Sequence, residues 1–339
     1  MRTHVIAVAA VTLVAACARS APEQASARID PTRLAAFAPL PAVMETPDNA
    51  LTEPKIALGR MLYYETRLSQ DGQHSCNSCH DLAAYGVDHE RVSSGVAGQR
   101  GTRNSPTVYN AAGHIAQFWD GRAPTVEEQA KGPILNPIEM AMPSDAAVLA
   151  QLSGIPAYDE AFRRAFPDDR HPVTYDNVGR AIGAFERGLV TPARWDAYLQ
   201  GEAAALTPAE RAGFNAFVDA GCSACHAGTY VGGASFQKVG LVEPWPGLAD
   251  AGRSAVTHRP EDRAVFKVPS LRNVARTAPY FHDGATADLT SAVALMAQHQ
   301  LGRQLTAPQI AAIVTWLETL TGTIPESYVA PPASPPSGL

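Results

Sequence analysis

The chain has 339 residues, of which 46% are hydrophobic and 18% charged, and its formal net charge is −6. This length and composition indicate a soluble globular protein of about two domains. The acidic balance excludes nucleic acid as a partner, because nucleic-acid binding needs a basic surface.

The first residues have the pattern of an export signal. Arg2 precedes an apolar run at 5–11, and the segment Leu-Val-Ala-Ala-Cys at 13–17 resembles a bacterial lipobox. We expect residues 1–16 to be a signal peptide and Cys17 to be lipidated; the alternative is a secretory signal cleaved near Ala18. The apolar run is too short to span a bilayer. Either signal exports the chain, and Ala18 favours an outer-membrane anchor facing the periplasm.

The rest of the chain predicts helices joined by long loops. Apolar residues recur at helical spacing over 178–189 and 310–320. No stretch shows sustained strand alternation. A threonine that can cap a helix, followed by a proline in the first turn, marks three helix starts, at Thr52, Thr207 and Thr306. We therefore predict an all-α fold.

These elements divide the chain into two domains with flexible ends. A small polar segment and lead-in come first, and a proline-rich tail comes last. The predicted boundaries are 17–47 for the tether and lead-in, 48–195 for the N-terminal domain, 196–325 for the C-terminal domain and 326–339 for the tail.

Two Cys-x-x-Cys-His pentads account for four of the five cysteines. They are Cys76, Cys79 and His80 in the first domain, and Cys222, Cys225 and His226 in the second. In such a pentad the two thiols bind the vinyl groups of one haem covalently, and the histidine binds the iron. Zinc would need a fourth ligand at each pentad, and a redox dithiol leaves the histidine unexplained. We expect two c-type haems, one in each of two cytochrome c-like domains with long loops.

Several runs outside the pentads resemble the bacterial di-haem cytochrome c peroxidase family, part of the superfamily that includes MauG. The runs, in chain order, are Arg-Asn-Ser-Pro-Thr-Val at 103–108, Gln-Phe-Trp-Asp-Gly-Arg at 117–122, Gln-Ala-Lys-Gly-Pro at 129–133, Ile-Glu-Met at 138–140, Lys-Val-Pro-Ser-Leu-Arg-Asn at 267–273 and Tyr-Phe-His-Asp-Gly at 280–284. The resemblance implies that the N-terminal haem reduces peroxide and that the C-terminal haem passes electrons to it.

The resemblance assigns the axial ligand of the second haem to Met296. A thioether ligand raises the potential of an electron-transfer iron. The alternative is a core methionine on the helical run 289–296. Relatives of the MauG type, which oxidise proteins, have tyrosine at this position, so Met296 favours a peroxidase.

The first haem needs a vacant face with an acid–base group nearby. The resemblance implies that Glu139 is that group, with a pKa raised by burial. It also implies that Gln129 orients the peroxide, that Trp119 relays electrons between the haems, and that His282 lies near the haem propionates. A solvated surface charge at Glu139, an aromatic wedge at Trp119 and a hydrogen-bonded structural histidine at His282 are the alternatives.

The family also holds a calcium ion between its domains. The matching positions are Asn104, through its side chain, and Thr277 and Pro279, through their carbonyls. Oxygen ligands suit Ca²⁺, but a set without carboxylates implies modest affinity. The alternative for Asn104 is an ordinary turn residue.

One position departs from the family pattern. Many members have a histidine eight residues before Asn104, which blocks the peroxide iron until the other haem is reduced. This chain has Val96 there, and valine does not bind iron. We therefore expect an enzyme that is active without prior reduction. His89 and His114 are nearby, and we expect each to be a free surface histidine.

The function implied by the resemblance is that of a cytochrome-c peroxidase. Hydrogen peroxide would be reduced to water with electrons from a small cytochrome c or blue-copper protein. The first alternative is a protein-modifying oxidase of the MauG type, and the second is a non-enzymatic electron carrier or redox sensor. A homodimer is left open.

Overall fold

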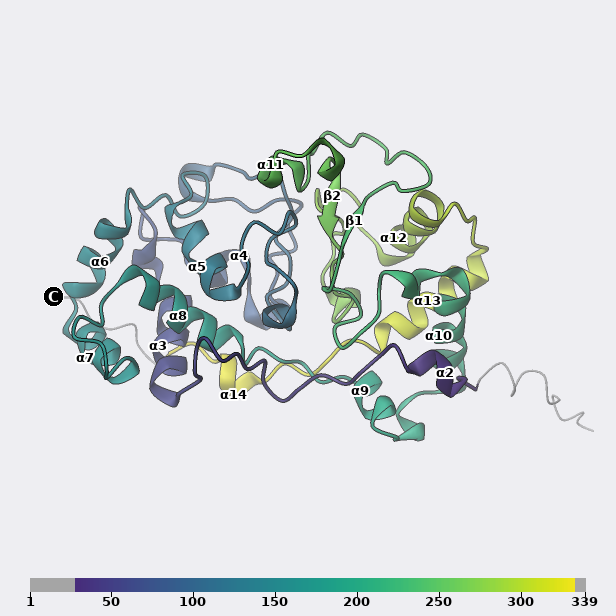
Figure 1. Ribbon diagram of the computed structural model, residues 1–339, viewed down its shortest axis with the longest axis horizontal. Helices are drawn as coiled ribbons and strands as arrows, with labels where there is room; N and C mark the ends of the chain where they lie inside the picture. The colour runs from purple at the N-terminus through teal and green to yellow at the C-terminus, as the bar shows by residue number, and fades with distance from the viewer. Residues whose placement is uncertain (1–27, 333–339) are drawn as a thin grey trace, which may run out of the picture.

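The computed structural model describes residues 28–332 and consists mainly of helices. The predicted signal peptide and Cys17 lie outside the described residues. Figure 1 shows two helical halves side by side. The helices of the first half are α3 (Glu53–Tyr63), α4 (Cys76–Cys79), α5 (Val126–Leu135), α6 (Asp145–Ser153), α7 (Pro156–Ala165) and α8 (Tyr175–Glu186). Those of the second half are α9 (Arg194–Leu199), α10 (Pro208–Ala220), α11 (Ser254–Thr257), α12 (Leu289–Leu295) and α13 (Ala307–Glu318).

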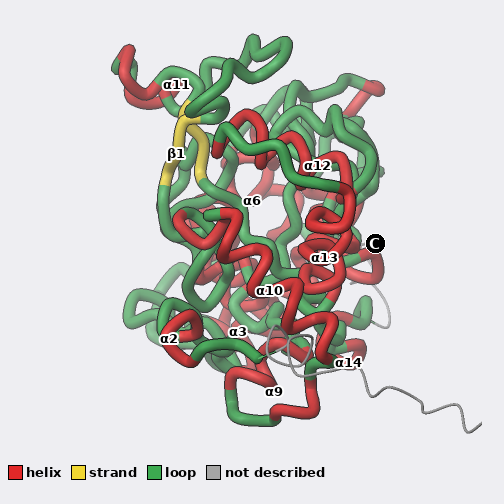
Figure 2. The backbone as a smooth tube through the Cα atoms, turned by 90° about the vertical axis from the view of Figure 1, so that its right-hand side faces the viewer, coloured by secondary structure: helices red, strands yellow, loops and turns green. Residues whose placement is uncertain are grey.

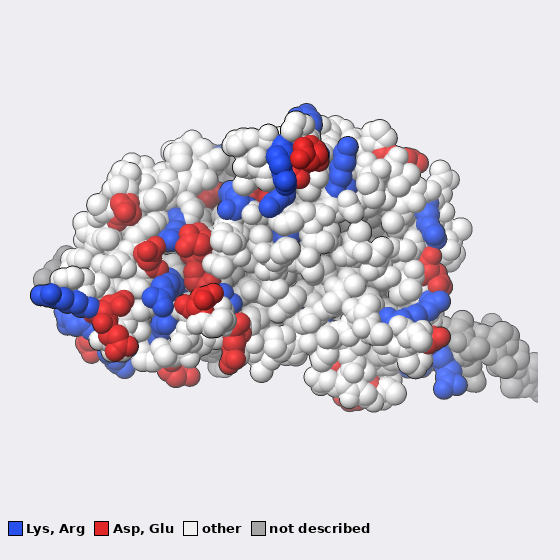
Figure 3. All heavy atoms as spheres, in the orientation of Figure 1, with Lys and Arg blue, Asp and Glu red and all other residues white. Residues whose placement is uncertain are grey.

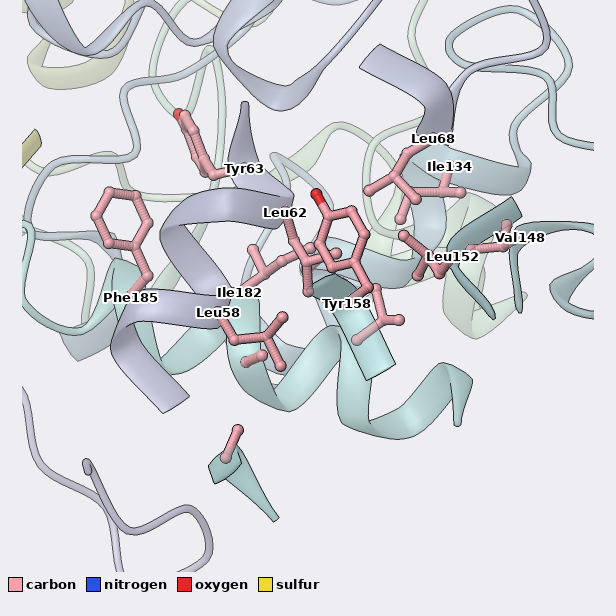
Figure 4. Packing of buried hydrophobic residues seen from close by; sticks show 14 of the residues in the cluster. Leu58, Leu62, Tyr63, Leu68, Ile134, Val148, Leu152, Tyr158, Ile182 and Phe185 are labelled. Atoms are coloured by element: carbon pink, nitrogen blue, oxygen red, sulfur yellow. The ribbon is translucent and has the colours of Figure 1, made fainter. Parts of the chain in front are cut away.

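The core of the first half forms where α3 and α8 pack against each other. Leu58 and Leu62 of α3 face Ile182 and Phe185 of α8, and Tyr158 of α7 lies beside them (Figure 4). All five side chains are fully or almost fully buried. The i, i+4 spacing that predicted an amphipathic helix over 178–189 therefore gives one face of this core, although α8 ends at Glu186.

The core of the second half forms around α10 and α13, which pack against each other. Phe214 of α10 and Trp316 of α13 meet edge to face, with ring centroids 5.3 Å apart. The predicted helix starts are confirmed. Thr207 and Thr306 each form a capping box, with Glu210 and Gln309 respectively. These caps satisfy backbone amides that have no partner within the helix.

Both ends of the described chain cross between the halves. Helix α2 (Pro31–Leu34) lies beside α10, and the chain then runs to α3 in the other half; after α13 it returns to α14 (Glu326–Val329) in the first half (Figure 1). Phe37 packs against Trp195 and Phe214 in the second core. Tyr328 stacks on Phe185, and its hydroxyl donates to the Phe185 carbonyl at 2.7 Å.

These contacts correct the domain limits expected from the sequence. Phe37 was assigned to a lead-in and Tyr328 to a tail, yet both pack in a core. Trp195, the expected last residue of the first domain, is fully buried in the second core. The predicted tail is therefore ordered over Glu326–Val329, and the two halves are joined by three segments rather than one.

The prediction of a mainly helical fold is confirmed, with one small exception. Strands β1 (Phe236–Lys238) and β2 (Val265–Lys267) form an antiparallel pair with Phe236 opposite Lys267. They are shown in yellow in Figure 2. The face in Figure 3 bears basic and acidic side chains interspersed, mostly over the first half and the upper edge. Across residues 28–332, none of the helices is both long and apolar enough to cross a membrane.

Candidate functional site

The first pentad forms a single helical turn. In α4 the amide of His80 donates to the carbonyl of Cys76 at 3.0 Å, and Ser75 caps the start of the turn. Residues three apart lie on one face of a helix, so Cys76 and Cys79 project to the same side. The hydroxyl of Tyr63 donates to the carbonyl of His80 at 2.8 Å, which anchors the turn to the first core.

The second pentad repeats this turn at the end of α10. Gly221 ends the helix in the left-handed conformation, with φ of 94°, and a 3₁₀ turn follows at Cys222–Ala224. The amide of His226 donates to the carbonyl of Cys222 at 3.0 Å, the same bond as in the first pentad. Two segments far apart in the sequence thus present two thiols and an imidazole in the same way.

Both histidines are half-buried, and the Nδ1 atom of each ring is fully buried. Burial lowers the pKa of His80, and backbone groups of Gly86 and Pro106 partly oppose this. Burial likewise lowers the pKa of His226 to about 4, opposed by backbone groups of Val231 and Pro269. Each ring is therefore neutral at pH 7, the form that binds a metal ion.

The two rings have unused polar atoms. Nδ1 of His80 and Nδ1 of His226 both lack a hydrogen-bond partner. A buried polar group without a partner is destabilising. The carbonyl groups of Pro106 and Pro269 act on these rings, so Nδ1 is suited to carry the ring proton, and Nε2 is then the atom that could bind iron as proximal ligand.

A cavity of about 260 Å³ adjoins the second pentad and is open toward solvent on one side. Cys222, Cys225 and His226 line it together with Met296, as the Met296 assignment requires. The rest of its wall is mostly apolar and comes largely from the second core. These residues are Phe217, Leu271, Val274, Leu289, Val293, Ile313 and Leu317.

The wall of this cavity fits a haem. Apolar side chains suit the faces of the macrocycle, and a thioether suits one axial position. Met296 begins a π-helical segment, Met296–Gln300, directly after α12. π-Helical turns occur often at functional sites, and here the π-helical segment begins at the candidate ligand.

The cysteines of the first pentad are half-buried. Burial raises the pKa of Cys76 far above its ordinary value, and the pKa of Cys79 to about 11. The four pentad cysteines form no disulfide. Nowhere in residues 28–332 do three His, Cys, Asp or Glu side chains converge as ligands for a metal ion. Thiols that are half-buried but unpaired fit thioether bonds to haem.

Glu139 lies at the first pentad. It follows α5 in a tight turn, and its carboxylate acts on the thiol of Cys79 to raise the thiol's pKa, after burial and together with Asp88. Burial raises the pKa of Glu139 itself, while the positive charge of Arg122 and a hydrogen bond from Asn136 lower it. Gln129 lies half-buried on α5, the helix that precedes this turn.

Trp119 and Asn104 link the two halves. The indole Nε1 of Trp119 donates to the carbonyl of Asn104 at 2.9 Å, and the amide of Asn104 donates to the carbonyl of His282 at 2.8 Å. The rings of Trp119 and His282 meet edge to face, 6.5 Å apart. All three residues line the cavity of the second pentad. Trp119 thus lines the cavity of the second pentad, although it belongs to the first half of the chain.

Sequence analysis did not identify the ion pairs that fix this contact. Arg103 donates to Asp250 of the second half through Nε at 2.7 Å and Nη2 at 2.8 Å, and it also pairs with Asp120. These hydrogen bonds oppose the effect of burial and raise the pKa of Arg103. The charge of Asp250, 147 positions away from Arg103, gave no local signal of a partner.

The candidate calcium positions lie together. Asn104, Thr277 and Pro279 all line the same cavity. Asn104 is buried, and its Nδ2 donates to the carbonyl of Glu90 at 3.0 Å. The structure therefore places the three residues on the wall of one cavity, and the calcium site stays a prediction.

Val96, at the position of the distal histidine, and the two nearby histidines differ in their surroundings. Val96 is buried, and its amide donates to the carbonyl of Glu139 at 2.8 Å. His89 is exposed, but its Nδ1 lies 2.9 Å from the carbonyl of Ala278 in the other half. The expectation for His114 was wrong: its ring is buried, with Nδ1 3.2 Å from Nζ of Lys267. Neither histidine is a free surface residue.

Comparisons with known proteins agree with this geometry. The family described as di-haem cytochrome c peroxidase matches residues 53–204. The chain is 44% identical to the cytochrome c551 peroxidase of Pseudomonas aeruginosa, over 88% of each chain. It is 35% identical to the methylamine utilization protein MauG of Paracoccus denitrificans, over 77% of this chain and 80% of that one. A solved MauG-like protein associated with microbial copper homeostasis superposes with a TM-score of 0.75 at 31% identity, covering 88% of this chain and 97% of its own.

Gly232 provides a test of the second haem site. It has φ of +128°, and an added Cβ would collide with the Pro269 carbonyl and lie 3.2 Å from Nδ1 of His226. We expect Gly232→Ala to cost about 1–3 kcal/mol of stability and to lower incorporation of the second haem, measured by haem content and thermal unfolding. Gly228→Ala is the matched control, because φ there is +78° and no atom lies within 4 Å of the added Cβ. Equal haem loss in both variants would contradict the prediction.

Proposed function

This chain belongs to the di-haem cytochrome c peroxidase family, and we propose that it reduces hydrogen peroxide to water as a cytochrome-c peroxidase. One H₂O₂, two electrons and two protons give two waters. The single observation on which the proposal rests is the half-buried carboxylate of Glu139 near the first pentad: burial raises its pKa, and its charge raises the pKa of Cys79. Such a group is suited to exchanging protons with a substrate near neutral pH.

Two covalently bound haems supply the chemistry that side chains lack: an iron that reacts with peroxide at the first pentad, and an iron that accepts single electrons at the second. Cys76, Cys79 and His80 would hold the first haem. Cys222, Cys225, His226 and Met296, which line one cavity, would hold the second. A sulfur ligand favours the reduced state, so electrons would enter at the second haem.

Within the first site, Glu139 would take the proton from one peroxide oxygen and deliver it to the other. Because the O–O bond breaks as the second oxygen gains that proton, this transfer lowers the barrier to cleavage. Gln129 would hold the peroxide by hydrogen bonding. Trp119, at the contact of the two halves, would relay electrons to this site.

The remaining assignments are proposals of the same kind. Electrons would come from a small periplasmic cytochrome c or a blue-copper protein. The chain would reach the periplasm through its signal peptide and be anchored to the outer membrane by a lipid on Cys17. One Ca²⁺ would be held by Asn104 and the carbonyls of Thr277 and Pro279, at the contact between the halves.

A protein-modifying oxidase of the MauG type is the alternative enzyme. Met296 supports the peroxidase, because relatives of the MauG type have tyrosine at the matching position. A non-enzymatic electron carrier would have no use for a buried acid–base group, so Glu139 supports an enzyme. Rapid oxidation of a reduced small cytochrome c by peroxide would favour the peroxidase over both alternatives.

Substitution of Glu139 tests the proposal directly. We expect Glu139→Gln to lower peroxide turnover by about 10²–10⁴-fold, because the amide does not transfer protons. The measurement is steady-state oxidation of a reduced cytochrome c by H₂O₂. Glu128→Gln is the control, since Glu128 is exposed on the nearby helix α5. Turnover by Glu139→Gln at the rate of the control would refute the assignment.

The pH profile tests the environment of Glu139. Glu139 must be ionised to take a proton, so kcat/KM should fall as the pH drops through its pKa, which burial has raised. The positive charge of Arg122 lowers that pKa, so Arg122→Gln should move the acidic limb to higher pH. We expect a shift below about one unit, because an exposed charge is screened by solvent. Arg163→Gln, on an exposed part of α7, should leave the limb in place.

The resting state tests the role of Val96. We expect the oxidised protein to show a high-spin ferric signal from the first haem in electron paramagnetic resonance, and to reduce peroxide without prior reduction. Val96→His would restore the residue that blocks the iron in many relatives, so this variant should need prior reduction. Two low-spin signals and no high-spin signal in the unmodified protein would contradict the prediction.

A further inference from the structure

Lys267 on β2 is a buried cation whose polar neighbour is a histidine. Its Nζ lies 3.2 Å from Nδ1 of His114, and burial lowers its pKa to about 8. Across residues 28–332 no carboxylate forms an ion pair or hydrogen bond with its ammonium group. A buried charge without a counter-charge is costly, so this arrangement favours an anion that the side chains do not provide.

The contact with Lys267 determines which nitrogen of His114 bears the proton. An ammonium group only donates hydrogen bonds, so Nδ1 accepts and the neutral ring has its proton on Nε2. Burial, and then the charge of Lys267, hold the pKa of His114 well below its ordinary value. His114 is therefore a neutral donor at pH 7. Its Nε2 is buried and has no hydrogen-bond partner.

The position of the His114 ring is fixed by its neighbours. Gly233 has φ of +74°, and an added Cβ would collide with Cδ2 of the ring. Tyr230 meets the ring edge to face, with centroids 5.4 Å apart. The ring has little freedom to turn Nε2 toward another partner.

Lys267 and His114 both line the cavity that Cys222, Cys225 and His226 line. We propose that Lys267 and His114 form an anion seat that binds a propionate carboxylate of the haem attached to this pentad and raises its reduction potential. The inference rests on the proposed haem at Cys222 and Cys225. A propionate fits better than a free anion, because its covalent attachment places a carboxylate permanently in the same cavity.

The anion seat has a direct consequence for electron transfer. A positive charge near an iron favours its reduced state, and the effect is strongest where solvent does not screen it. The amide of Lys267 donates to the carbonyl of Trp119 at 2.8 Å. The anion seat is thus hydrogen-bonded to Trp119, the residue proposed to relay electrons. It would set the reduction potential of the second haem, from which that relay begins.

The test is a redox titration of the second haem, followed by its visible spectrum in the intact two-haem protein. Lys267→Met should shift the potential downward, and Lys267→Arg should largely retain it. His114→Gln should give a smaller downward shift, since it removes a neutral donor. Lys238→Met is the matched control, because it removes the same charge from an exposed position on the paired strand β1. Its shift should be much smaller than that of Lys267→Met.

The outcomes separate the anion seat from the proposed function. An unchanged potential in Lys267→Met that retains both haems would overturn the seat, and so would a shift equal to that of Lys238→Met. If Lys267→Met fails to fold, an unchanged potential in His114→Gln would overturn it instead. A potential that depends on added acetate in the unmodified protein but not in Lys267→Met or His114→Gln would indicate a free anion and also overturn it. A protein with the expected shifts that leaves peroxide unreduced would refute the function alone.

Discussion

The core of the second half is interrupted by the cavity beside Cys222, and the candidate haem site depends on this cavity. Phe217, Val274, Ile313 and Leu317 are buried members of that core and also line the cavity beside Cys222. Side chains that line a cavity make fewer contacts with protein atoms than side chains inside a closed core. A haem attached at the pentad would supply those contacts, so it would act as part of the core and would be held by packing as well as by ligands.

The two pentads have the same backbone turn, so their difference comes from what lies near each cavity. At the second pentad the chain offers Met296, where α12 continues as a π-helical segment. At the first pentad it offers the half-buried carboxylate of Glu139, while Val96 is tied through its amide to the Glu139 carbonyl. Neither valine nor a carboxylate with a raised pKa is a soft iron ligand. The surroundings thus favour a saturated iron at one pentad and an accessible one at the other.

Electron transfer between two irons needs halves that keep a constant separation. The segment around Phe37 packs in the core of the second half before the chain enters the first half. The segment around Tyr328 follows the second half and packs in the core of the first. The bidentate pair of Arg103 with Asp250 adds a directional contact near Trp119. Partly buried pairs of this geometry are screened less than surface pairs. Apolar and ionic contacts together therefore resist a hinge motion that would move Trp119.

Local chemistry in the sequence was enough to predict the pentads, the capped starts at Thr207 and Thr306, and the helical fold, because each depends on neighbours within a few residues. Phe37 and His114 were misjudged for the opposite reason. Phe37 is buried only because Trp195 and Phe214 are brought to it, and His114 acquires its tautomer from Lys267, 153 positions away. A histidine in a polar loop gives no sign of such a partner. The electrostatics of the site are therefore a property of the tertiary contact between β2 and the 111–119 loop, and a relative that retained both pentads but lost Lys267 would keep its haems while losing the charge proposed to set one of their potentials.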